Sequence, residues 1–135
     1  MNVNKISTVI ITLNEEATIE RCLNSVLDIS DEILVLDSHS TDDTARICKT
    51  FNKVRLIPTD WLGYSKTKNK GATLAKHNFI LSIDADEALD QLAIASIQKS
   101  KKSLSKFKRT KDYFLPNNKP LKAGMILKNK NYLFV

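Results

Sequence analysis

A chain of 135 residues with 42% apolar and 27% charged residues has the size and composition of one globular domain with a real core. The net charge is +6, and only three glycines and three prolines argue against a disordered or fibrous chain. Its apolar runs are too short to span a bilayer, and the N-terminus MNVNKIST lacks the basic-then-apolar pattern of a secretion signal. We therefore expect a cytoplasmic protein.

The first half of the chain alternates buried-strand patterns with helical periodicity. Ile6–Leu13 predicts a strand, and Asn14 is expected to be the N-cap of the helix that follows. The apolar stripe of this helix has i, i+3, i+4, i+7 and i+8 spacing and consists of Ile19, Cys22, Leu23, Val26 and Leu27. Glu32–Asp37 predicts a second strand, and Ser40 with Asp43 resembles a capping box that opens a second helix.

The second half of the chain continues the same alternation. Residues 53–59 (KVRLIPT) predict a third strand, after which a loop leads into a helix that ends near His77. Phe79–Ile83 predicts the fourth strand, and the next helix is expected to bury Leu89, Leu92, Ala93 and Ile97 on one face. Residues 112–118 are compatible with a short strand, and residues 121–135 support no assignment.

This order of elements predicts an α/β fold with a mostly parallel sheet covered by helices on both faces. Ligands of such sheets bind beyond the carboxyl ends of the strands. The expected binding loops are therefore those that follow Leu13, Leu36, Ile57 and Ile83.

Acids and hydroxyls are concentrated in three of these loops: Thr12, Asn14 and Glu15; Asp37, Ser38, Ser40 and Asp42; Asp84, Asp86 and Glu87. The segment before the fourth strand adds Lys66, Lys68, Asn69 and Lys70. Acids and lysines in one crevice suit a phosphorylated ligand held with a divalent cation, because Mg²⁺ and Mn²⁺ take carboxylate and phosphate oxygens. A cation at Asp86 would also compensate the carboxylates that end an apolar strand. The alternative for Asp37 and Asp42 is that they cap the turn and helix that follow, and Lys66 and Lys70 can equally be surface residues.

Several other types of site are disfavoured. The chain has no GxGxxG, GxxxxGK[ST] or GxSxG motif, which argues against a dinucleotide-binding domain, a P-loop NTPase and a nucleophile-elbow hydrolase. Cys22 and Cys48 fall on predicted apolar stripes, where we expect small buried hydrophobes. A disulfide or metal site is the alternative for the two cysteines, although no CxxC or His/Cys cluster accompanies them.

A basic run stands out in the last third of the chain. Lys99–Lys111 contains seven basic residues and no acids. One interpretation is a solvated helix end, and the other is peripheral attachment to anionic headgroups at the inner membrane face. Nucleic acid is the weaker partner for this run, because it holds a single aromatic residue, Phe107, and no known binding module.

Four blocks of the sequence resemble, in order, the motifs of family 2 glycosyltransferases with the GT-A fold, and bacterial lipopolysaccharide-core enzymes most of all. They are STVIITLNEEATIERCLNSV, DEILVLDSHSTDDT, DWLGYSKTKNKGA and FILSIDADE. The resemblance covers about Ile6 to Leu92. It implies a nucleotide-sugar-binding domain over residues 1–110 and a poorly matched tail over residues 111–135.

The resemblance also assigns roles to individual positions. Thr12, Asn14 and Glu15 match the nucleotide-contacting segment after the first strand, and Asp37, followed by Ser38, matches the acid that binds uracil. Lys68 and Asn69 match the block that faces donor phosphate and sugar. Asp84 matches the ribose-facing acid, and Asp86 matches the ligand of a divalent cation, Mg²⁺ or Mn²⁺. The implied reaction is metal-dependent, inverting transfer of a sugar from a UDP-sugar to a glycan or lipid-linked acceptor, such as a lipopolysaccharide core.

The chain departs from the family pattern in two respects. His39 and Asp43 stand where the second block usually has glycines, and a positive φ at His39 would carry some strain. Members of the family also continue well past the metal motif with an acceptor region and a general base. No catalytic base is identifiable here, since Asp112 is the only acid after Asp90 and nothing places it at a site.

Two alternatives to a complete transferase therefore stand. The chain can be truncated after the donor-binding half, and so act as a nucleotide-sugar-binding remnant or as one subunit of a split enzyme. A haloacid-dehalogenase-like phosphohydrolase also places Asp-x-Asp after an apolar strand. That enzyme class uses its first strand, whereas the motif here follows the fourth.

Overall fold

The computed structural model describes residues 5–103 and 124–127. The elements follow the predicted alternation of strand and helix. They are β1 (Ile6–Thr12), α1 (Ile19–Val26), β2 (Glu32–Asp37), α2 (Thr44–Lys49), β3 (Val54–Pro58), α3 (Tyr64–Leu74), β4 (Phe79–Asp84), α4 (Gln91–Ser103) and β5 (Gly124–Leu127). The short strand considered for residues 112–118 lies outside the described residues. No helix within the described ranges is long and apolar enough to cross a bilayer.

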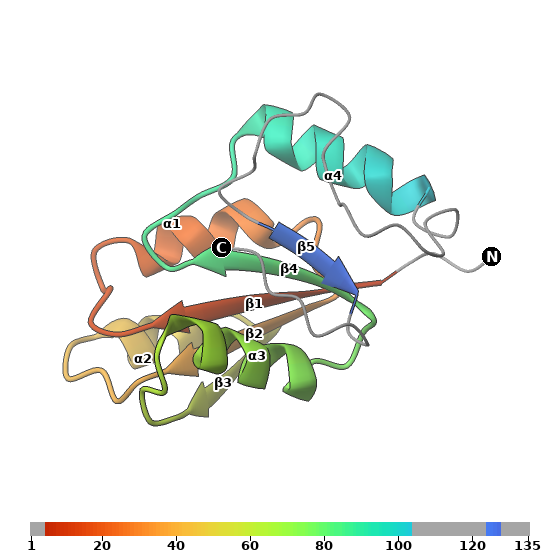
Figure 1. Cartoon of the computed structure of the whole chain (residues 1–135). Coiled ribbons are helices and arrows are strands. Elements are labelled where there is room, and N and C mark those ends of the chain that lie inside the picture. Colours follow the sequence, from red (N-terminus) through yellow and green to blue (C-terminus); the bar gives the residue numbers. More distant parts are fainter. Residues whose placement is uncertain (1–4, 104–123, 128–135) are drawn as a thin grey trace.

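The sheet has the order β3-β2-β1-β4-β5, with β1 to β4 parallel and β5 antiparallel to β4 (Figure 1). This confirms the predicted α/β class and mostly parallel sheet. In register, Thr12 pairs with Asp37 and Ile11 pairs with Asp84. The carboxyl ends of β2, β1 and β4 therefore meet at one edge, and the three acid-bearing loops start side by side.

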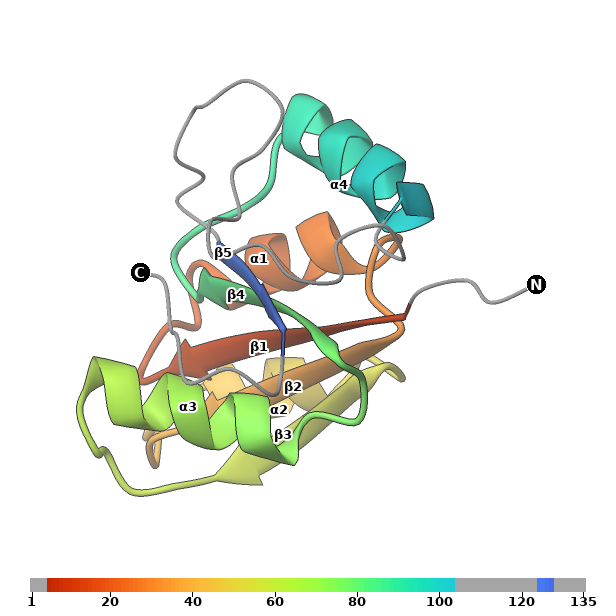
Figure 2. The ribbon, with the colours of Figure 1, turned by 45° about the vertical axis from the view of Figure 1, so that its right-hand side comes forward.

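Helices cover both faces of the sheet (Figures 1 and 2). On one face α1, α2 and α4 pack over the larger core cluster, which includes Ile10, Leu23, Cys48, Ile83 and Ile97. On the other face α3 packs over a smaller cluster around Val9, Leu34 and Ile80. The strands read as continuous apolar runs because both of their faces are buried.

The two cysteines behave as buried hydrophobes, as predicted. Cys22 and Cys48 are free, fully buried thiols in the larger core cluster. Burial, with smaller contributions from nearby carboxylates, raises the pKa of Cys22 to about 12 and that of Cys48 to about 11. Both thiols are therefore protonated at neutral pH.

The predicted helix starts at Asn14 and Ser40 are wrong. α1 begins at Ile19 and α2 at Thr44, so neither residue caps a helix. The two loops bond to each other instead. The Asn14 N–H donates to Ser40 Oγ at 2.8 Å, and the Thr41 N–H donates to Asn14 Oδ1 at 2.8 Å. The polar groups of Asn14 and Ser40 that would have capped a helix therefore bond across the two loops. Asn14 adopts a φ of 52°.

The apolar face predicted for α4 is also partly wrong. Leu92 is 80% exposed, whereas Ile94 and Ile97 pack against the core. α4 begins at Gln91, after Leu89, which the sequence placed on this helix, and the Ala93 N–H donates to Asp90 Oδ1 at 2.7 Å. Glu87 lies before this helix, and its Oε2 accepts the Asp84 N–H at 3.1 Å. Glu87 thus closes the turn after β4.

α3 lies very close to the sheet because of a glycine. A Cβ on Gly71 would come within 3.0 Å of Leu36 Cδ1 and closer still to Val9 Cγ1. The helix ends at Leu74, before the expected end near His77, and the Arg55 guanidinium donates to the Leu74 carbonyl oxygen. This close packing sets the distance between the side chains of α3 and the sheet.

Candidate functional site

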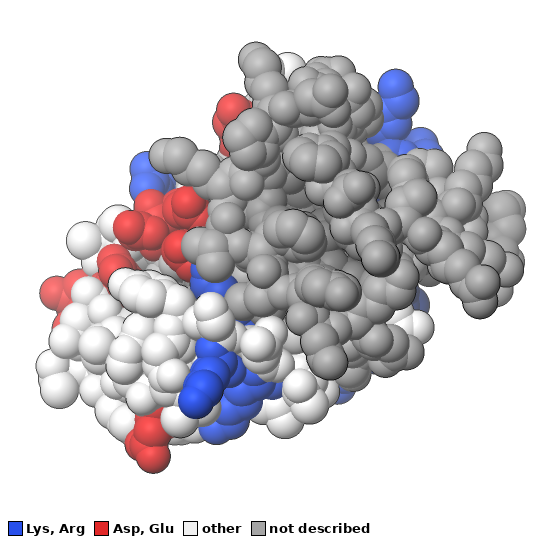
Figure 3. Space-filling model, in the orientation of Figure 1, with Lys and Arg blue, Asp and Glu red and all other residues white. Residues whose placement is uncertain are grey.

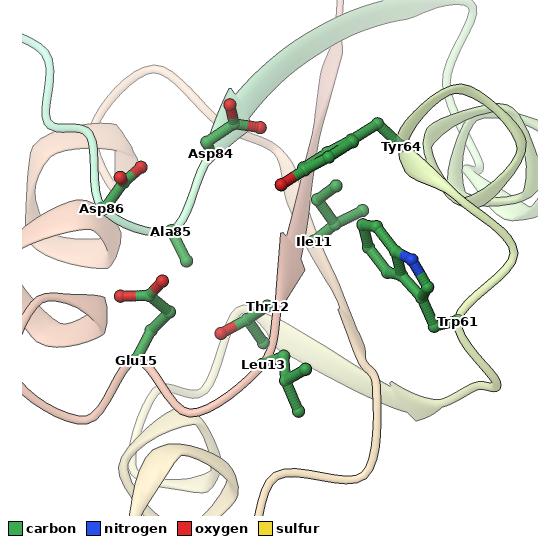
Figure 4. A pocket seen from close by; sticks show the side chains of 9 residues that line it. All are labelled: Ile11, Thr12, Leu13, Glu15, Trp61, Tyr64, Asp84, Ala85 and Asp86. Atoms are coloured by element: carbon green, nitrogen blue, oxygen red, sulfur yellow. The ribbon is translucent and has the colours of Figure 1, made fainter.

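A pocket of about 520 Å³ opens where β1 and β4 end (Figure 4). Nine residues line it, contributed by β1 and its loop, the loop before α3, the start of α3, and the end of β4. They are Ile11, Thr12, Leu13, Glu15, Trp61, Tyr64, Asp84, Ala85 and Asp86. The structure therefore has a pocket at the edge of the sheet where the sequence predicted ligand binding.

Carboxylates line one side of the pocket. Glu15 comes from the β1–α1 loop, and Asp84 and Asp86 come from the end of β4. The acidic side chains on this face gather at the end of the sheet where β1 and β4 terminate (Figure 3). Arg21 on α1 donates to the Asp86 carbonyl oxygen at 3.1 Å and so ties the turn after β4 to that helix.

Lys68 is the counter-ion of Asp84. Its Nζ lies 2.7 Å from Asp84 Oδ1, and its side chain is only 5% exposed, against 35% for Asp84. The lysine lies on α3 and is not among the residues that line the pocket. Its ammonium therefore compensates the negative charge of Asp84. The exposed carboxylate of Asp86 stays open to the pocket.

Buried polar groups lie beside the pocket floor. Thr12 lines the pocket, and its Oγ1 has no hydrogen-bond partner among the described residues, nor has Ser38 Oγ. Asp37 is 5% exposed, and its carboxylate accepts the Ser40 N–H at 3.0 Å and the Ser40 hydroxyl. Asp37 thus caps the following turn, one of the alternatives that the sequence left open. Each carboxylate oxygen keeps room for a further donor.

Other predicted site residues lie away from the pocket. Asn14 joins two loops, as described above, and Asn69 is exposed on α3. Lys66 is exposed, and Lys70 Nζ donates to Thr59 Oγ1 at 2.6 Å. Asp42 Oδ1 accepts the Thr44 N–H at 2.9 Å, which is the helix-capping role considered for it.

Two aromatic residues in the pocket were not predicted from the sequence. Trp61 and Tyr64 form an edge-to-face pair with 4.8 Å between ring centroids and an interplanar angle of 89°. Figure 4 shows both rings on the side of the pocket opposite Glu15 and Asp86. The sequence could have indicated them, because aromatic side chains in a polar segment that follows a β-strand are not expected to pack into the core.

The pocket fits a divalent cation only in combination with a ligand. Within residues 5–103 and 124–127, no three His, Cys, Asp or Glu side chains converge to hold a metal ion. Mg²⁺ is commonly bound by one or two carboxylates together with phosphate oxygens. The open Asp86 carboxylate beside Glu15 is a donor set of that kind, to which a diphosphate would add the missing oxygens.

The sequence profile described as glycosyl transferase family 2 matches residues 7–121. The chain belongs to this family. The Asp84-Ala85-Asp86 segment of this family 2 chain sits at the end of β4, the fourth strand, and the phosphohydrolase alternative has no support.

Relatives of the family 2 chain include glycosyltransferases from several bacteria. A Rickettsia typhi glycosyltransferase is 49% identical over 87 residues, which are 64% of this chain and 30% of the relative. The lipopolysaccharide core biosynthesis glycosyltransferase LpsC of Rhizobium meliloti is 36% identical over 90 residues, 64% of this chain and 33% of LpsC. The chain spans about a third of the length of these relatives.

Two solved structures share the fold. TarS of S. aureus in complex with UDP-GlcNAc superposes with a TM-score of 0.60 at 27% identity, over 73% of this chain and 31% of TarS. Glucosyl-3-phosphoglycerate synthase of Mycobacterium tuberculosis, in complex with Mn²⁺, UDP and glucosyl-3-phosphoglycerate, gives a TM-score of 0.53 at 28% identity. That match covers 63% of this chain and 36% of the synthase.

Proposed function

We propose that this chain binds a UDP-sugar in the pocket at the ends of β1 and β4, as the donor-binding part of a metal-dependent, inverting glycosyltransferase. Residues 1–110 form the donor-binding unit in this proposal. The observation that carries it is the meeting of Thr12, Glu15, Asp84 and Asp86 in one pocket of a family 2 fold. The UDP-GlcNAc complex of TarS and the UDP complex of the mycobacterial synthase support a UDP-sugar as donor.

Each side chain has a distinct role in the proposed site. Asp84, held by Lys68, accepts a hydrogen bond from a ribose hydroxyl, and Thr12 Oγ1 gains a partner from the bound nucleotide. Asp86, with Glu15 beside it, would hold a divalent cation together with the donor diphosphate. Bound there, the cation would stabilise the negative charge that develops on the departing UDP. Asp37 keeps Ser40 in place and binds the uracil edge through its remaining lone pairs.

The transfer step needs a general base, and none is identified among the described residues. The acceptor hydroxyl attacks the anomeric carbon, the bond from that carbon to the diphosphate breaks, and the hydroxyl proton passes to a base. Such a base typically contributes about 10² to 10⁴ in rate. Asp112 lies outside the described residues. Donor binding without transfer is therefore the second candidate function, in which this chain supplies the donor site and another chain supplies the acceptor side.

The acceptor is proposed by analogy alone. LpsC acts in lipopolysaccharide core biosynthesis, and a lipid-linked glycan of that kind would place the protein at the inner membrane face. The basic residues of Lys99–Lys111 would then contact anionic headgroups. Within the described part of this run, Lys101 already pairs with Asp31 at 2.7 Å, so it is not freely available to a membrane.

Isothermal titration calorimetry of UDP, with and without Mn²⁺, tests the donor site. We expect UDP to bind the wild-type chain more tightly with Mn²⁺ than without it, and we expect Asp86→Ala to abolish that difference. Asp43→Ala is the matched control, because Asp43 is an exposed acid beyond the pocket. Metal-independent binding, or no binding at all, would overturn the proposal. Release of UDP from UDP-GlcNAc in the presence of candidate acceptors then separates a transferase from a donor-binding chain.

A further inference from the structure

The loop that carries Trp61 is held firmly in place. We call residues 59–63 the aromatic loop. Its first residue is fixed twice, because the Thr59 N–H donates to the Asp37 carbonyl oxygen at 2.9 Å and Lys70 Nζ donates to Thr59 Oγ1 at 2.6 Å. Its last part is fixed by α3, where Thr67 Oγ1 accepts the Leu62 N–H at 3.3 Å.

A further contact ties the aromatic loop to the loop after β2. His39 Nε2 lies 2.8 Å from Asp60 Oδ1, directly before Trp61. These contacts order the backbone on both sides of the indole, although the indole itself is not buried. A side chain presented in this way has already lost much of the entropy that ligand binding would otherwise cost.

Trp61 and Tyr64 are large apolar groups left open to the pocket. Trp61 is 48% exposed and Tyr64 is 64% exposed, and both line the cavity. Their edge-to-face contact uses only part of each ring surface. Figure 4 shows the Tyr64 hydroxyl pointing into the pocket, with the indole of Trp61 on the same side of the pocket as the Tyr64 ring. The pocket therefore has an aromatic side as well as an acidic side.

The order of the strands places these two sides relative to a bound nucleotide. Along the edge β3-β2-β1-β4, the aromatic loop follows β3, Asp37 ends β2, Thr12 ends β1 and the acid pair ends β4. In the proposed site the phosphates lie beside Asp86 and the uracil edge at Asp37, so the nucleotide would run from the β4 end of this row toward β3. Its planar base then reaches the aromatic side of the pocket.

We infer that Trp61 stacks on the nucleobase of the nucleotide donor, with Tyr64 supporting the indole from its edge. This inference rests on the proposed function and adds to it a residue that determines donor affinity. A base offers a flat π-face to an aromatic side chain, and Ala substitution of such a residue costs about 5- to 150-fold in affinity. Stacking is tolerant of base identity, so selection of uracil is left to polar groups such as Asp37.

The chain offers a direct optical test, because Trp61 is its only tryptophan. We expect uridine monophosphate and UDP to change the intensity of the wild-type indole emission at saturation, since a stacked base quenches an indole. Ribose 5-phosphate, which lacks the base, should leave the emission unchanged. Equal quenching by ribose 5-phosphate and the nucleotide would overturn the inference.

Calorimetry on variants supplies the affinities. Trp61→Ala should weaken UDP and uridine monophosphate by the same factor, about 5- to 150-fold, while Trp61→Phe retains most of the affinity. Leu62→Ala is the matched control, because Leu62 is 47% exposed in the same loop and does not line the pocket. Circular dichroism checks that each variant is folded.

The outcomes separate this inference from the proposed function. If the wild-type chain binds UDP with Mn²⁺ and Trp61→Ala binds it equally well, the stacking inference is wrong and the donor site stands. If Trp61→Ala weakens UDP-GlcNAc but not UDP, the indole contacts the sugar, which also overturns it. If the wild-type chain binds no UDP in the presence of Mn²⁺, the proposed function fails and the inference fails with it.

Discussion

Lys68 and Asp84 form an ion pair from the middle of α3 to the end of β4, with 2.7 Å between Nζ and Oδ1. The lysine is almost fully buried and does not line the pocket, while the carboxylate is partly exposed at the pocket wall. The ion pair offsets part of the negative charge that the acids place at the end of an apolar strand. One of them is compensated by the protein itself, and Asp86 is left for a ligand.

A double-mutant cycle on this pair measures its coupling. We expect Lys68→Met to lower the free energy of unfolding by about 1 to 3 kcal/mol, because it leaves Asp84 without its counter-ion. Asp84→Asn in the Lys68→Met background should recover part of that loss, giving a coupling energy of about 0.5 to 3 kcal/mol. Urea unfolding supplies the four values. Lys66→Met, an exposed position on the same helix, is the control and should change stability by less than about 0.5 kcal/mol. Strict additivity would show that the two groups do not interact.

Gly71 sets the distance between α3 and the sheet. Gly71→Ala adds a Cβ that meets Val9 and Leu36, so we expect overpacking to cost about 1 to 3 kcal/mol, offset by at most about 1 kcal/mol of helix propensity. Urea unfolding measures the net loss. UDP affinity should fall as well, because α3 carries Lys68 and Tyr64. Thr73→Ala, at an exposed site whose hydroxyl donates only within the same helix, to the Asn69 carbonyl oxygen, is the control without overpacking. A stabilised Gly71→Ala protein would contradict the packing argument.

His39 occupies a backbone conformation that favours glycine, with a φ of 59°. His39→Gly and His39→Ala both remove the contact with Asp60, so the difference between them isolates the backbone. We expect the glycine variant to be more stable than the alanine variant by about 1 kcal/mol, the balance of left-handed strain against the entropy of glycine in the unfolded chain. Thermal unfolding checks the order of the two variants. Asp60→Ala gives the value of the exposed His39–Asp60 hydrogen bond, which should be below about 1 kcal/mol.

Glu32 should make the fold sensitive to acid. Burial alone would raise the pKa of Glu32, but hydrogen bonds from the Ser7 hydroxyl and the Lys76 N–H, with the charge of Arg55, outweigh it and hold the pKa below its ordinary value of 4.5. A carboxylate with a depressed pKa contributes stability that is present above pH 4.5 and is lost as the pH falls through the folded-state pKa.

The variant Glu32→Gln tests this contribution. At pH 7 it should be less stable than wild type by about 1.5 to 3 kcal/mol, since hydrogen bonds to a charged group are lost. Because the variant has no proton to gain at this position, the difference should shrink toward pH 3. Urea unfolding between pH 3 and pH 7 measures how the free energy of unfolding of the wild type and of the variant changes with pH. The exposed Glu20→Gln is the control. A difference that stays constant with pH would rule out Glu32 as the source.

The buried strands were predictable, and so were the faces of the first helix. β2 matches its prediction residue for residue, and the stripe Ile19, Cys22, Leu23 and Val26 is buried as its spacing indicated. Leu92 shows where that logic ends. Its spacing placed it on an apolar face with Ile97, but α4 buries Ile97 as predicted and turns Ile94 toward the core in place of Leu92. Periodicity defines a stripe, and the tertiary packing selects which part of it is covered.

The sequence by itself determined the order of strands, helices and motifs along the chain, and with it the family, because apolar runs and motif spacing are properties of short segments. Only the tertiary structure decided which motif residues contact one another. Asn14 and Ser40 are 26 residues apart in the chain and bond across two loops, and Lys68 pairs with Asp84 where we expected a phosphate contact. Trp61 and Tyr64 are site residues because the loop before α3 and the first residue of that helix lie at the pocket. Such contacts depend on the distance between elements, which local patterns do not encode.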